Sequence, residues 1–325
     1  RNAPALFNLG AHEFTTMFHD GRLEADPTRP SGIRTPLGTE MVQGFASVLS
    51  AQSMFPVLSP DEMAGHYTES DVARAVRQGF LTGEDGAWSL ISARVADIKE
   101  YQSAFEQING PGHSVTFTDI SDVIAEFIAF EWRADDSPFD QYLRTGEPLP
   151  KAANLGMSLF YGKAQCSTCH AGQFQTDHDF HAIALPQVGP GKSARFETHA
   201  RDEGRLRVTG NPADAYKFRT PSLRNIAQTA PYGHNGAYAT LEAMIRHHLD
   251  PVASLKAYNV AQLVLPDLPN SQDFRATHDP DEQAAIAAAN ELSPSNLSEM
   301  EIMQIVAFLN ALSDTASLAG KLGVP

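Results

Sequence analysis

The chain has 325 residues with 24 basic and 39 acidic side chains, which gives a formal charge of −15. This length predicts about two domains, and a hydrophobic fraction of 42% is ordinary for a folded protein. The negative charge excludes a surface for nucleic acid or anionic membranes, because phosphate groups would be repelled. No stretch approaches the roughly 18 apolar residues of a membrane span, since the best run, 123–130, contains Glu126.

The first half of the chain is predicted to be helical with long loops. Thr118 is a candidate N-cap, because apolar residues follow it at helical spacing at positions 120, 123, 124 and 127. Residues 135–150 are polar and contain three prolines and a glycine, a composition typical of a linker between domains. A shorter helix is expected near 154–161.

The second half contains a long irregular segment and two well-marked helices. Residues 171–216 are rich in His, Gly and Pro without sustained periodicity, and loops of this length are usually functional or disordered. Thr240 is predicted to cap one helix, and Ser298 with Glu301 forms a capping box before the amphipathic segment 302–312. Residues after Asp314 are expected to form a tail.

The two cysteines of the chain occur in one motif, since residues 166–170 read Cys-Ser-Thr-Cys-His. In this motif the thiols of Cys166 and Cys169 bind a haem through thioether bonds and His170 ligates the iron. The alternatives are half of a zinc site, which lacks further cysteines, and a redox dithiol, which lacks a surrounding βαβ pattern. We therefore expect covalent haem c, and a periplasmic location, because this attachment takes place outside the cytoplasm.

A second axial ligand is expected on the helix after Thr240. His248 extends an apolar stripe at helical spacing, whereas His247 points about 100° away, so the two cannot serve one iron equally. His248 is the better candidate, and its alternative role is that of a buried structural histidine. Met244 is the local competitor, although such a methionine is more often part of the core.

Several blocks of sequence surround these residues in a specific order. Residues 218–225 read Phe-Arg-Thr-Pro-Ser-Leu-Arg-Asn, 230–236 read Ala-Pro-Tyr-Gly-His-Asn-Gly, and Thr-Leu-Glu follows at 240–242. The N-terminal blocks are 1–8 (Arg-Asn-Ala-Pro-Ala-Leu-Phe-Asn), 18–22 (Phe-His-Asp-Gly-Arg) and 51–63 (Ala-Gln-Ser-Met-Phe-Pro-Val-Leu-Ser-Pro-Asp-Glu-Met). Together these blocks resemble the bacterial di-haem cytochrome c peroxidase and MauG family.

The resemblance implies a mainly α fold with two cytochrome c-like haem domains and long loops. It places a peroxidatic haem domain at 1–140, a second haem domain at 141–313 and a tail at 314–325. Members of the family carry one haem in each domain and a calcium ion between them. One haem reacts with hydrogen peroxide and the other relays electrons. The family is often dimeric, so a homodimer is a further expectation.

The resemblance also assigns roles to individual residues. His170 and His248 would be the axial ligands of the electron-relay haem, and because the family has Met or Tyr where His248 stands, a bis-His iron is implied. Two nitrogen donors usually lower a haem potential relative to His/Met. The calcium ligands are matched by Asn2, Thr229 and the carbonyl of Pro231, all oxygen donors of the kind that a hard cation prefers.

Glu62 matches the distal glutamate of the peroxidatic site, and Gln52 matches the glutamine near it. Peroxide cleavage moves a proton from the near oxygen to the leaving oxygen, and a carboxylate above the iron can perform both transfers. The alternative reading of Glu62 is a solvated side chain in a proline-rich turn.

The sequence departs from the family pattern in three places. The first Cys-x-x-Cys-His motif of the family lies upstream of residue 1, so we expect that the sequence lacks its beginning and that this segment carries the second haem. His19 stands where a tryptophan normally relays electrons between the haems, and its alternative is a loop histidine that touches neither haem. Residues 23–50 form an insertion relative to the peroxidases. Together with the loop around Gly189 and residues 246–251, this insertion most resembles MauG-like enzymes of methanobactin operons.

Three functions remain open from the sequence. The first is a peroxide-driven oxidase that acts on a partner protein, such as on a tryptophan, with residues 23–50 and 171–216 forming the docking face. The second is a peroxidase that detoxifies hydrogen peroxide with electrons from a small cytochrome c or copper protein. The third is a haem electron carrier without enzymatic activity, in which His170 and His248 saturate the iron.

Overall fold

Helices form most of the regular structure of this computed structural model, which describes residues 2–191, 199–263 and 273–322. Contacts divide the chain into two compact units. Unit 1 contains residues 1–8, 18–21 and 132–325, and unit 2 contains residues 9–17 and 22–131. These units do not coincide with the predicted ranges 1–140 and 141–313, because the first residues of the chain join the C-terminal unit.

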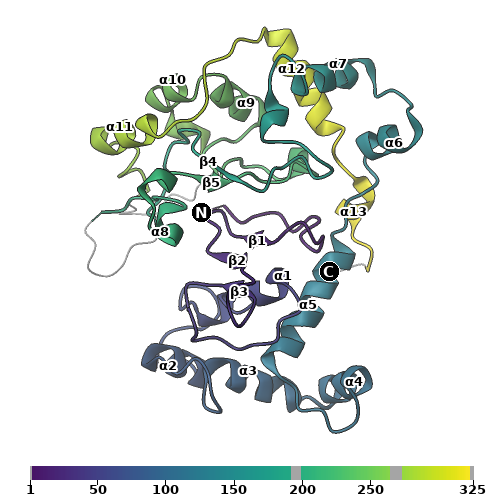
Figure 1. The fold of residues 1–325 in the computed structure, drawn as a ribbon, viewed down its shortest axis with the longest axis vertical. Coiled ribbons are helices and arrows are strands. Elements are labelled where there is room, and N and C mark those ends of the chain that lie inside the picture. The colour runs from purple at the N-terminus through teal and green to yellow at the C-terminus, as the bar shows by residue number, and fades with distance from the viewer. Residues whose placement is uncertain (1, 192–198, 264–272, 323–325) are drawn as a thin grey trace. The chain divides into compact units, whose positions relative to one another are not determined.

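Unit 2 combines a small sheet with five helices (Figure 1). Strand β2 (Leu23–Ala25) pairs antiparallel with both β1 (Thr16–Met17) and β3 (Ile33–Arg34). The helices are α1 (Val48–Gln52), α2 (Asp71–Gln78), α3 (Ala87–Ala96), α4 (Lys99–Asn109) and α5 (Phe117–Glu131), with a 3-10 turn η1 at Pro56–Leu58. The core of this unit includes the fully buried Trp88, whose Nε1 donates to the carbonyl of Met54.

Unit 1 contains the remaining elements. Its helices are α6 (Pro138–Thr145), α7 (Lys151–Phe160), α8 (Leu206–Thr209), α9 (Leu241–Leu249), α10 (Pro251–Lys256), α11 (Pro280–Ala288), α12 (Glu299–Asn310) and α13 (Thr315–Ala319). Strand β4 (Phe180–His181) pairs antiparallel with β5 (Phe218–Arg219). The 3-10 turns are η2 (Cys166–Thr168), η3 (Pro212–Asp214), η4 (Ile226–Gln228) and η5 (Val260–Gln262).

The tightest packing in unit 1 lies between α7 and α12, which run side by side in Figure 1. A Cβ atom placed on Gly156 would lie 1.8 Å from the carbonyl oxygen of Gln304, so only glycine permits this approach. Phe160 and Phe308 meet edge to face beside it, with ring centroids 5.2 Å apart. This contact fixes the helix that leads into the cysteine motif.

Helix α12 confirms the predicted capping box, since the hydroxyl of Ser298 accepts from the backbone N–H of Glu301 and the Glu301 carboxylate accepts from Ser298. Thr240 caps α9 as predicted. The cap predicted at Thr118 is wrong by a few residues: α5 already begins at Phe117, and the carboxylate of Asp119 accepts from the backbone N–H of Thr116.

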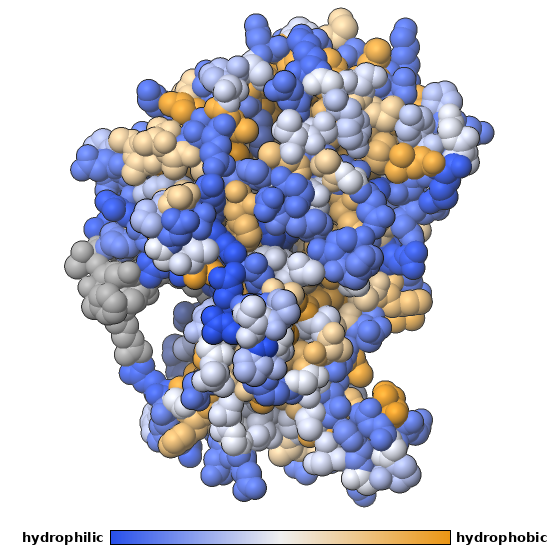
Figure 2. Space-filling model, viewed as in Figure 1, coloured by the Kyte–Doolittle hydropathy of each residue, from blue (hydrophilic) through white to orange (hydrophobic). Residues whose placement is uncertain are grey.

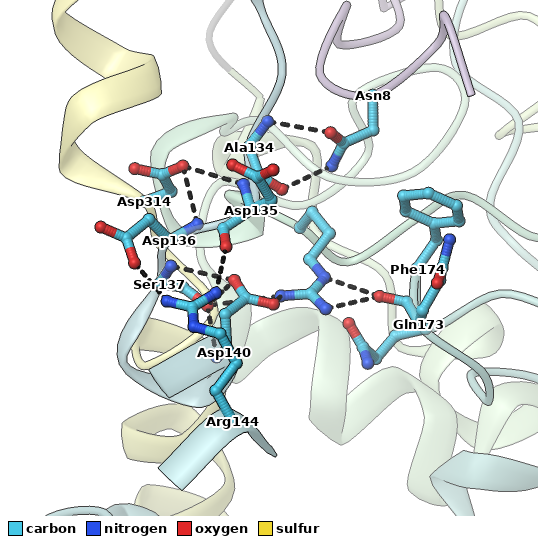
Figure 3. Close-up of polar contacts among 12 residues, drawn as sticks. Asn8, Ala134, Asp135, Asp136, Ser137, Asp140, Arg144, Gln173, Phe174 and Asp314 are labelled. Carbon is cyan, nitrogen blue, oxygen red and sulfur yellow. Dashed lines mark hydrogen bonds and ion pairs between the residues drawn. The ribbon is translucent and has the colours of Figure 1, made fainter. Parts of the chain in front are cut away.

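The segment 135–150 is not only a linker, because it contains α6. Pro138 occupies the first turn, and Ser137 with Asp140 forms a capping box that the proline-based interpretation overlooked. The prediction of a tail after Asp314 is also partly wrong, since helix α13 begins at the next residue. The Oδ1 atom of Asp314 caps this helix, and its Oδ2 atom accepts from the backbone N–H groups of Asp135 and Asp136 (Figure 3).

Hydrophilic residues cover most of the face shown in Figure 2, with apolar residues scattered among them. Within the described ranges, none of the helices is both long and apolar enough to cross a membrane.

Candidate haem site

The cysteine motif forms a tight turn just after α7. Residue Gln165 has a positive φ of 54°, which lets the chain reverse into the turn η2. The backbone N–H of His170 donates to the carbonyl of Cys166 at 2.9 Å. This closed turn places Cys166, Cys169 and His170 together in one short stretch, and both cysteines are free thiols.

His170 is held through one of its two ring nitrogens. Its Nδ1 lies 3.1 Å from the carbonyl oxygen of Gln175, an acceptor, so Nδ1 carries the proton. No described residue forms a hydrogen bond with Nε2, which leaves that lone pair available to a metal. Burial lowers the pKa of His170 to about 4, so the ring is neutral at pH 7, the form that ligates metals.

His248 is held in the same way from the opposite element. On α9 its Nδ1 lies 2.8 Å from the carbonyl oxygen of Met244, one helical turn earlier. Its Nε2 also has no hydrogen bond within the described part of the chain. Burial lowers the pKa of His248 as well, so it too is neutral at pH 7.

The rings of His170 and His248 meet edge to face, and the distance between their centroids is close to that of two imidazoles that share a metal. Their centroids are 6.5 Å apart and their planes are inclined by 61°. Because an imidazole nitrogen lies about 2.0 Å from a bound metal, two rings on opposite sides of one ion have centroids about 6 Å apart. The pair His170 and His248 therefore fits the axial ligation of a haem iron.

His247 differs from its neighbour in both ring nitrogens. Its Nε2 donates to the carbonyl of Ile183 at 2.8 Å, and its Nδ1 accepts from the hydroxyl of Tyr238 at 3.0 Å. The side chain is fully buried, and burial lowers its pKa to about 3. This is the geometry of a structural histidine, whereas the side chain of Met244 packs in the cluster around Leu185 and Tyr232.

A second arrangement of ligand atoms shares one of the cysteines. The Sγ of Cys169, a carboxylate oxygen of Asp177 and a ring nitrogen of His181 all lie within 4.8 Å of one another. Structural zinc sites usually have four ligands, and the group has three among the described residues. A thioether bond at Cys169 would remove its thiolate from this set, so the two uses of Cys169 exclude one another.

Two of the three expected calcium ligands lie together in unit 1. The amide Nδ2 of Asn2 donates to the carbonyl of Pro231 at 2.7 Å, and the backbone N–H of Asn2 donates to the carbonyl of His234. The hydroxyl of Thr229 donates to the carbonyl of Ile226 at 3.2 Å. A cation here would require the amide oxygen of Asn2, in place of its nitrogen, to face Pro231.

The expected peroxidatic residues lie in unit 2 and are held less firmly. Gln52 is the last residue of α1, and its Oε1 is shielded from solvent without a hydrogen-bond partner in the described chain. Glu62 lies in an exposed turn, where its backbone N–H donates to the carbonyl of Ser59. A buried oxygen without a donor fits the expectation that Gln52 faces a ligand.

His19 belongs to a stack of rings that the sequence alone does not reveal. Its centroid lies 5.4 Å from that of His234 and 5.8 Å from that of Phe218, and the latter two stack at 3.6 Å. The Nε2 of His234 lies 3.4 Å from a carboxylate oxygen of Asp202. His234 was within a family block, but its spacing gave no sign that it would meet His19.

Comparison with known proteins gives a consistent result. Residues 1–147 match the family described as di-haem cytochrome c peroxidase. Cytochrome-c peroxidase IdrP1 of Denitromonas iodatirespirans is 29% identical over 279 residues, covering 78% of this chain and 65% of the relative. Methylamine utilization protein MauG of Methylorubrum extorquens is 28% identical over 210 residues, covering 63% and 50%. The chain thus spans less than two thirds of these relatives.

A solved structure resembles the whole chain. It is described as a MauG-like protein associated with microbial copper homeostasis, with a TM-score of 0.63, 25% identity and coverage of 100% of this chain and 78% of that one. The helical fold and the Cys-x-x-Cys-His turn are those expected of a c-type haem protein. Residues 1–147 match the di-haem cytochrome c peroxidase family, and the chain as a whole is similar to cytochrome c peroxidases and MauG proteins.

Proposed function

We propose that the protein is a periplasmic di-haem enzyme that uses hydrogen peroxide to oxidise a residue of a partner protein. The observation that supports this proposal is the pair His170 and His248. Their ring centroids lie 6.5 Å apart, and each ring uses Nδ1 for a backbone hydrogen bond while its Nε2 has no hydrogen-bond partner among the described residues. A bis-His iron has no open position, so it is suited to relaying electrons and not to binding peroxide.

The residues of unit 1 would hold one haem covalently. Cys166 and Cys169 would supply the thioether bonds, and His170 and His248 the axial nitrogens. The haem supplies one-electron redox chemistry, and the chain supplies orientation: the carbonyls of Gln175 and Met244 fix each imidazole in the tautomer with Nε2 unprotonated.

The residues of unit 2 would handle peroxide at the second haem that the family carries. Glu62 would take the proton from one peroxide oxygen and return it to the other, which makes the second a better leaving group. Gln52 would orient the peroxide through its unpartnered Oε1. His19 would lie on the path of electrons between the two haems, and Asn2, Thr229 and Pro231 would bind calcium.

Oxidation of a partner protein is favoured over detoxification by the MauG-like description of the structure that matches the whole chain. The similarity of the loops to MauG-like enzymes makes a tryptophan on a partner protein the expected target. Residues 23–50 of unit 2 and residues 171–216 of unit 1 are each candidates for contacting that partner, and residues 192–198 of the second segment lie outside the described residues. The second candidate is a cytochrome c peroxidase fed by a small cytochrome or copper protein, favoured by the similarity to relatives named cytochrome-c peroxidase. The third is a haem electron carrier.

Haem counting tests the first requirement. Intact mass and a pyridine haemochrome assay on the full-length gene product should give two haems per chain. One haem per chain would contradict both enzymatic candidates and favour the electron carrier. An intact mass without haem, together with bound zinc, would instead assign Cys169, Asp177 and His181 to a metal site.

Peroxide titration separates the enzymatic candidates. A long-lived oxidised state after addition of peroxide, in the absence of donors, is expected for oxidation of a partner protein. Rapid turnover with reduced cytochrome c would instead favour detoxification. The haem of unit 1 should give a low-spin bis-His spectrum, and a methionine–iron charge-transfer band would contradict the role of His248.

A further inference from the structure

Arg219 is a shielded cation without an anionic partner among the described residues. It ends strand β5, and its Nη1 is shielded from solvent and has no hydrogen-bond partner there. Its Nε donates to the carbonyl of Phe18 at 3.3 Å, and its backbone N–H donates to the carbonyl of His19. These neutral acceptors hold the side chain in place but do not neutralise its charge.

Other shielded arginines of unit 1 show how such a charge is normally compensated. Arg224 pairs with the carboxylate of Asp140 at 2.6 Å. Arg205 lies 4.2 Å above the ring of Phe180 and donates to the carbonyl of Gly21. Desolvation lowers the pKa of Arg219 to about 10, with no neighbouring carboxylate to oppose it, and the guanidinium is still charged at pH 7. Arg219 is partly exposed as a residue, but its Nη1 is shielded from solvent, and a charge shielded in this way is costly unless an anion meets it.

The position of Arg219 relates it to the cysteine turn. The hydroxyl of Thr176 donates to the carbonyl of Thr220 at 2.8 Å. This hydrogen bond joins the residue that follows Gln175 in the chain to the residue that follows Arg219. Gln175 is the residue whose carbonyl holds the axial His170. Strand β5 also pairs with β4, whose His181 lies beside Cys169.

A haem carries two propionate carboxylates at its edge, and a guanidinium matches a carboxylate with two parallel N–H donors. We propose that Arg219 binds a propionate carboxylate of the haem attached at Cys166 and Cys169. In this role Arg219 is a positioning residue: it fixes the propionate edge, keeps that carboxylate ionised, and sets the charge next to the ring.

The test measures the midpoint potential of the bis-His haem in Arg219→Gln and Arg219→Lys, in the haem-loaded protein without peroxide. Arg219→Gln leaves the propionate charge uncompensated, which favours ferric iron. We expect the ratio of ferrous to ferric haem at a fixed potential to fall at least tenfold, which is about 59 mV for a one-electron couple. Arg219→Lys keeps a cation and should retain most of the wild-type potential.

The pH dependence gives a readout that a purely structural role would not move. Without the arginine, the propionate should bind a proton at higher pH, so the potential of Arg219→Gln should become pH-dependent near neutrality, where that of wild type is flat. The matched control is Arg246→Gln. Arg246 is an exposed arginine on the same helix as His248, and it is already paired with Glu242 and Glu299.

Three outcomes would overturn the proposal. One is a potential that changes no more in Arg219→Gln than in Arg246→Gln. Another is a midpoint potential of the wild-type protein that shifts with chloride concentration at constant ionic strength. This result would show that the Arg219 guanidinium binds a diffusible anion and not a propionate. If Arg219→Gln does not fold, Arg219→Lys is compared with Arg219→Met, which has no charge. Midpoint potentials of these two variants that differ equally from that of wild type would contradict a role for the charge.

Discussion

The two compact units hold their candidate site residues in different ways. In unit 1, His170 and His248 are each fixed by a hydrogen bond to a backbone carbonyl within a few residues of their own position. In unit 2, Gln52 has a shielded oxygen without a hydrogen-bond partner among the described residues, and Glu62 lies in an exposed turn. The candidate ligands of unit 1 are therefore positioned by their own backbone, whereas the candidate side chains of unit 2 are not.

The largest expected effect breaks the site of unit 1 directly. Replacing both cysteines, Cys166→Ala with Cys169→Ala, should abolish covalent haem at this site because no thioether can form. Haem staining of denaturing gels and intact mass would measure it. Ser167→Ala lies between the two cysteines and should retain the haem, and a double-cysteine variant with an unchanged haem count would contradict the assignment of the turn.

A substitution in unit 2 should slow the reaction with peroxide without changing the absorbance spectrum of the haem in unit 1. Glu62→Gln should slow the reaction with peroxide by about 10²–10⁴-fold, the usual contribution of a general acid–base group. Stopped-flow absorbance would measure the rate, and the bis-His spectrum should be unchanged. Asp61→Asn, next in the same exposed turn, is the control. Equal rates in Glu62→Gln and wild type would exclude the proposed proton transfer.

The buried ion pair of unit 1 should matter for stability more than any exposed pair. Arg224→Ala leaves the buried carboxylate of Asp140 with its capping-box hydrogen bonds from Ser137 but without a cationic partner, and should lower the free energy of unfolding by about 3–5 kcal/mol. Arg144→Ala breaks an exposed pair with Asp136 and should cost about 0–1 kcal/mol. Urea denaturation measures both, and similar losses would show that the pair formed by Arg224 is not buried in solution.

Acid should destabilise the haem-free form of unit 1. The pKa of His170 is lowered from 6.5 to about 4 in the folded chain, so the unfolded chain binds protons first as the pH falls. Stability from this group is therefore complete above pH 6.5 and is lost progressively toward pH 4. Denaturation of haem-free protein at several pH values should show a free energy of unfolding that falls between pH 6.5 and pH 4. The substitution His170→Gln should make this fall smaller. An unchanged slope would exclude a buried neutral His170.

The smallest expected effect concerns the cap of α12. Ser298→Ala should lower the free energy of unfolding by about 1 kcal/mol, because the backbone N–H of Glu301 loses its acceptor. Thermal or urea unfolding would measure it. Ser295→Ala, in the preceding loop, serves as the control, and a larger loss at Ser295 than at Ser298 would contradict the assignment of the cap.

Local sequence signals predicted the parts of the fold that local chemistry decides. The capping box of Ser298 and the cap at Thr240 were both predicted, because a cap is formed by residues within one turn. Helix α6 was missed, because prolines were read as breaks, although proline is well suited to the first turn of a helix. Helix α13 was missed because five residues carry too little periodicity to show a pattern.

The candidate site shows the same division. The cysteine turn and the choice of His248 over His247 were predicted from motif and helical spacing, and the ligand role of both stays a prediction. In the structure His248 lies near His170, whereas both ring nitrogens of His247 are hydrogen-bonded. The stack of His19 with His234 joins segments about two hundred residues apart, and no local pattern encodes such a meeting. Arg219 has no anionic partner among the described residues, and the shielding of its Nη1 depends on tertiary packing, so neither feature could be predicted from the sequence.

The side chain of Arg224 connects segments whose motions should therefore be linked. It pairs with Asp140 in the capping box of α6, and its Nε donates to the carbonyl of Gln173 in the loop after the cysteine turn. Asp140 and Gln173 are both labelled in Figure 3. Loss of either contact is expected to weaken the other, because both depend on the position of one guanidinium. The first turn of α6 and the loop around Gln173 should then open as one cooperative unit, with matching rates of amide hydrogen exchange.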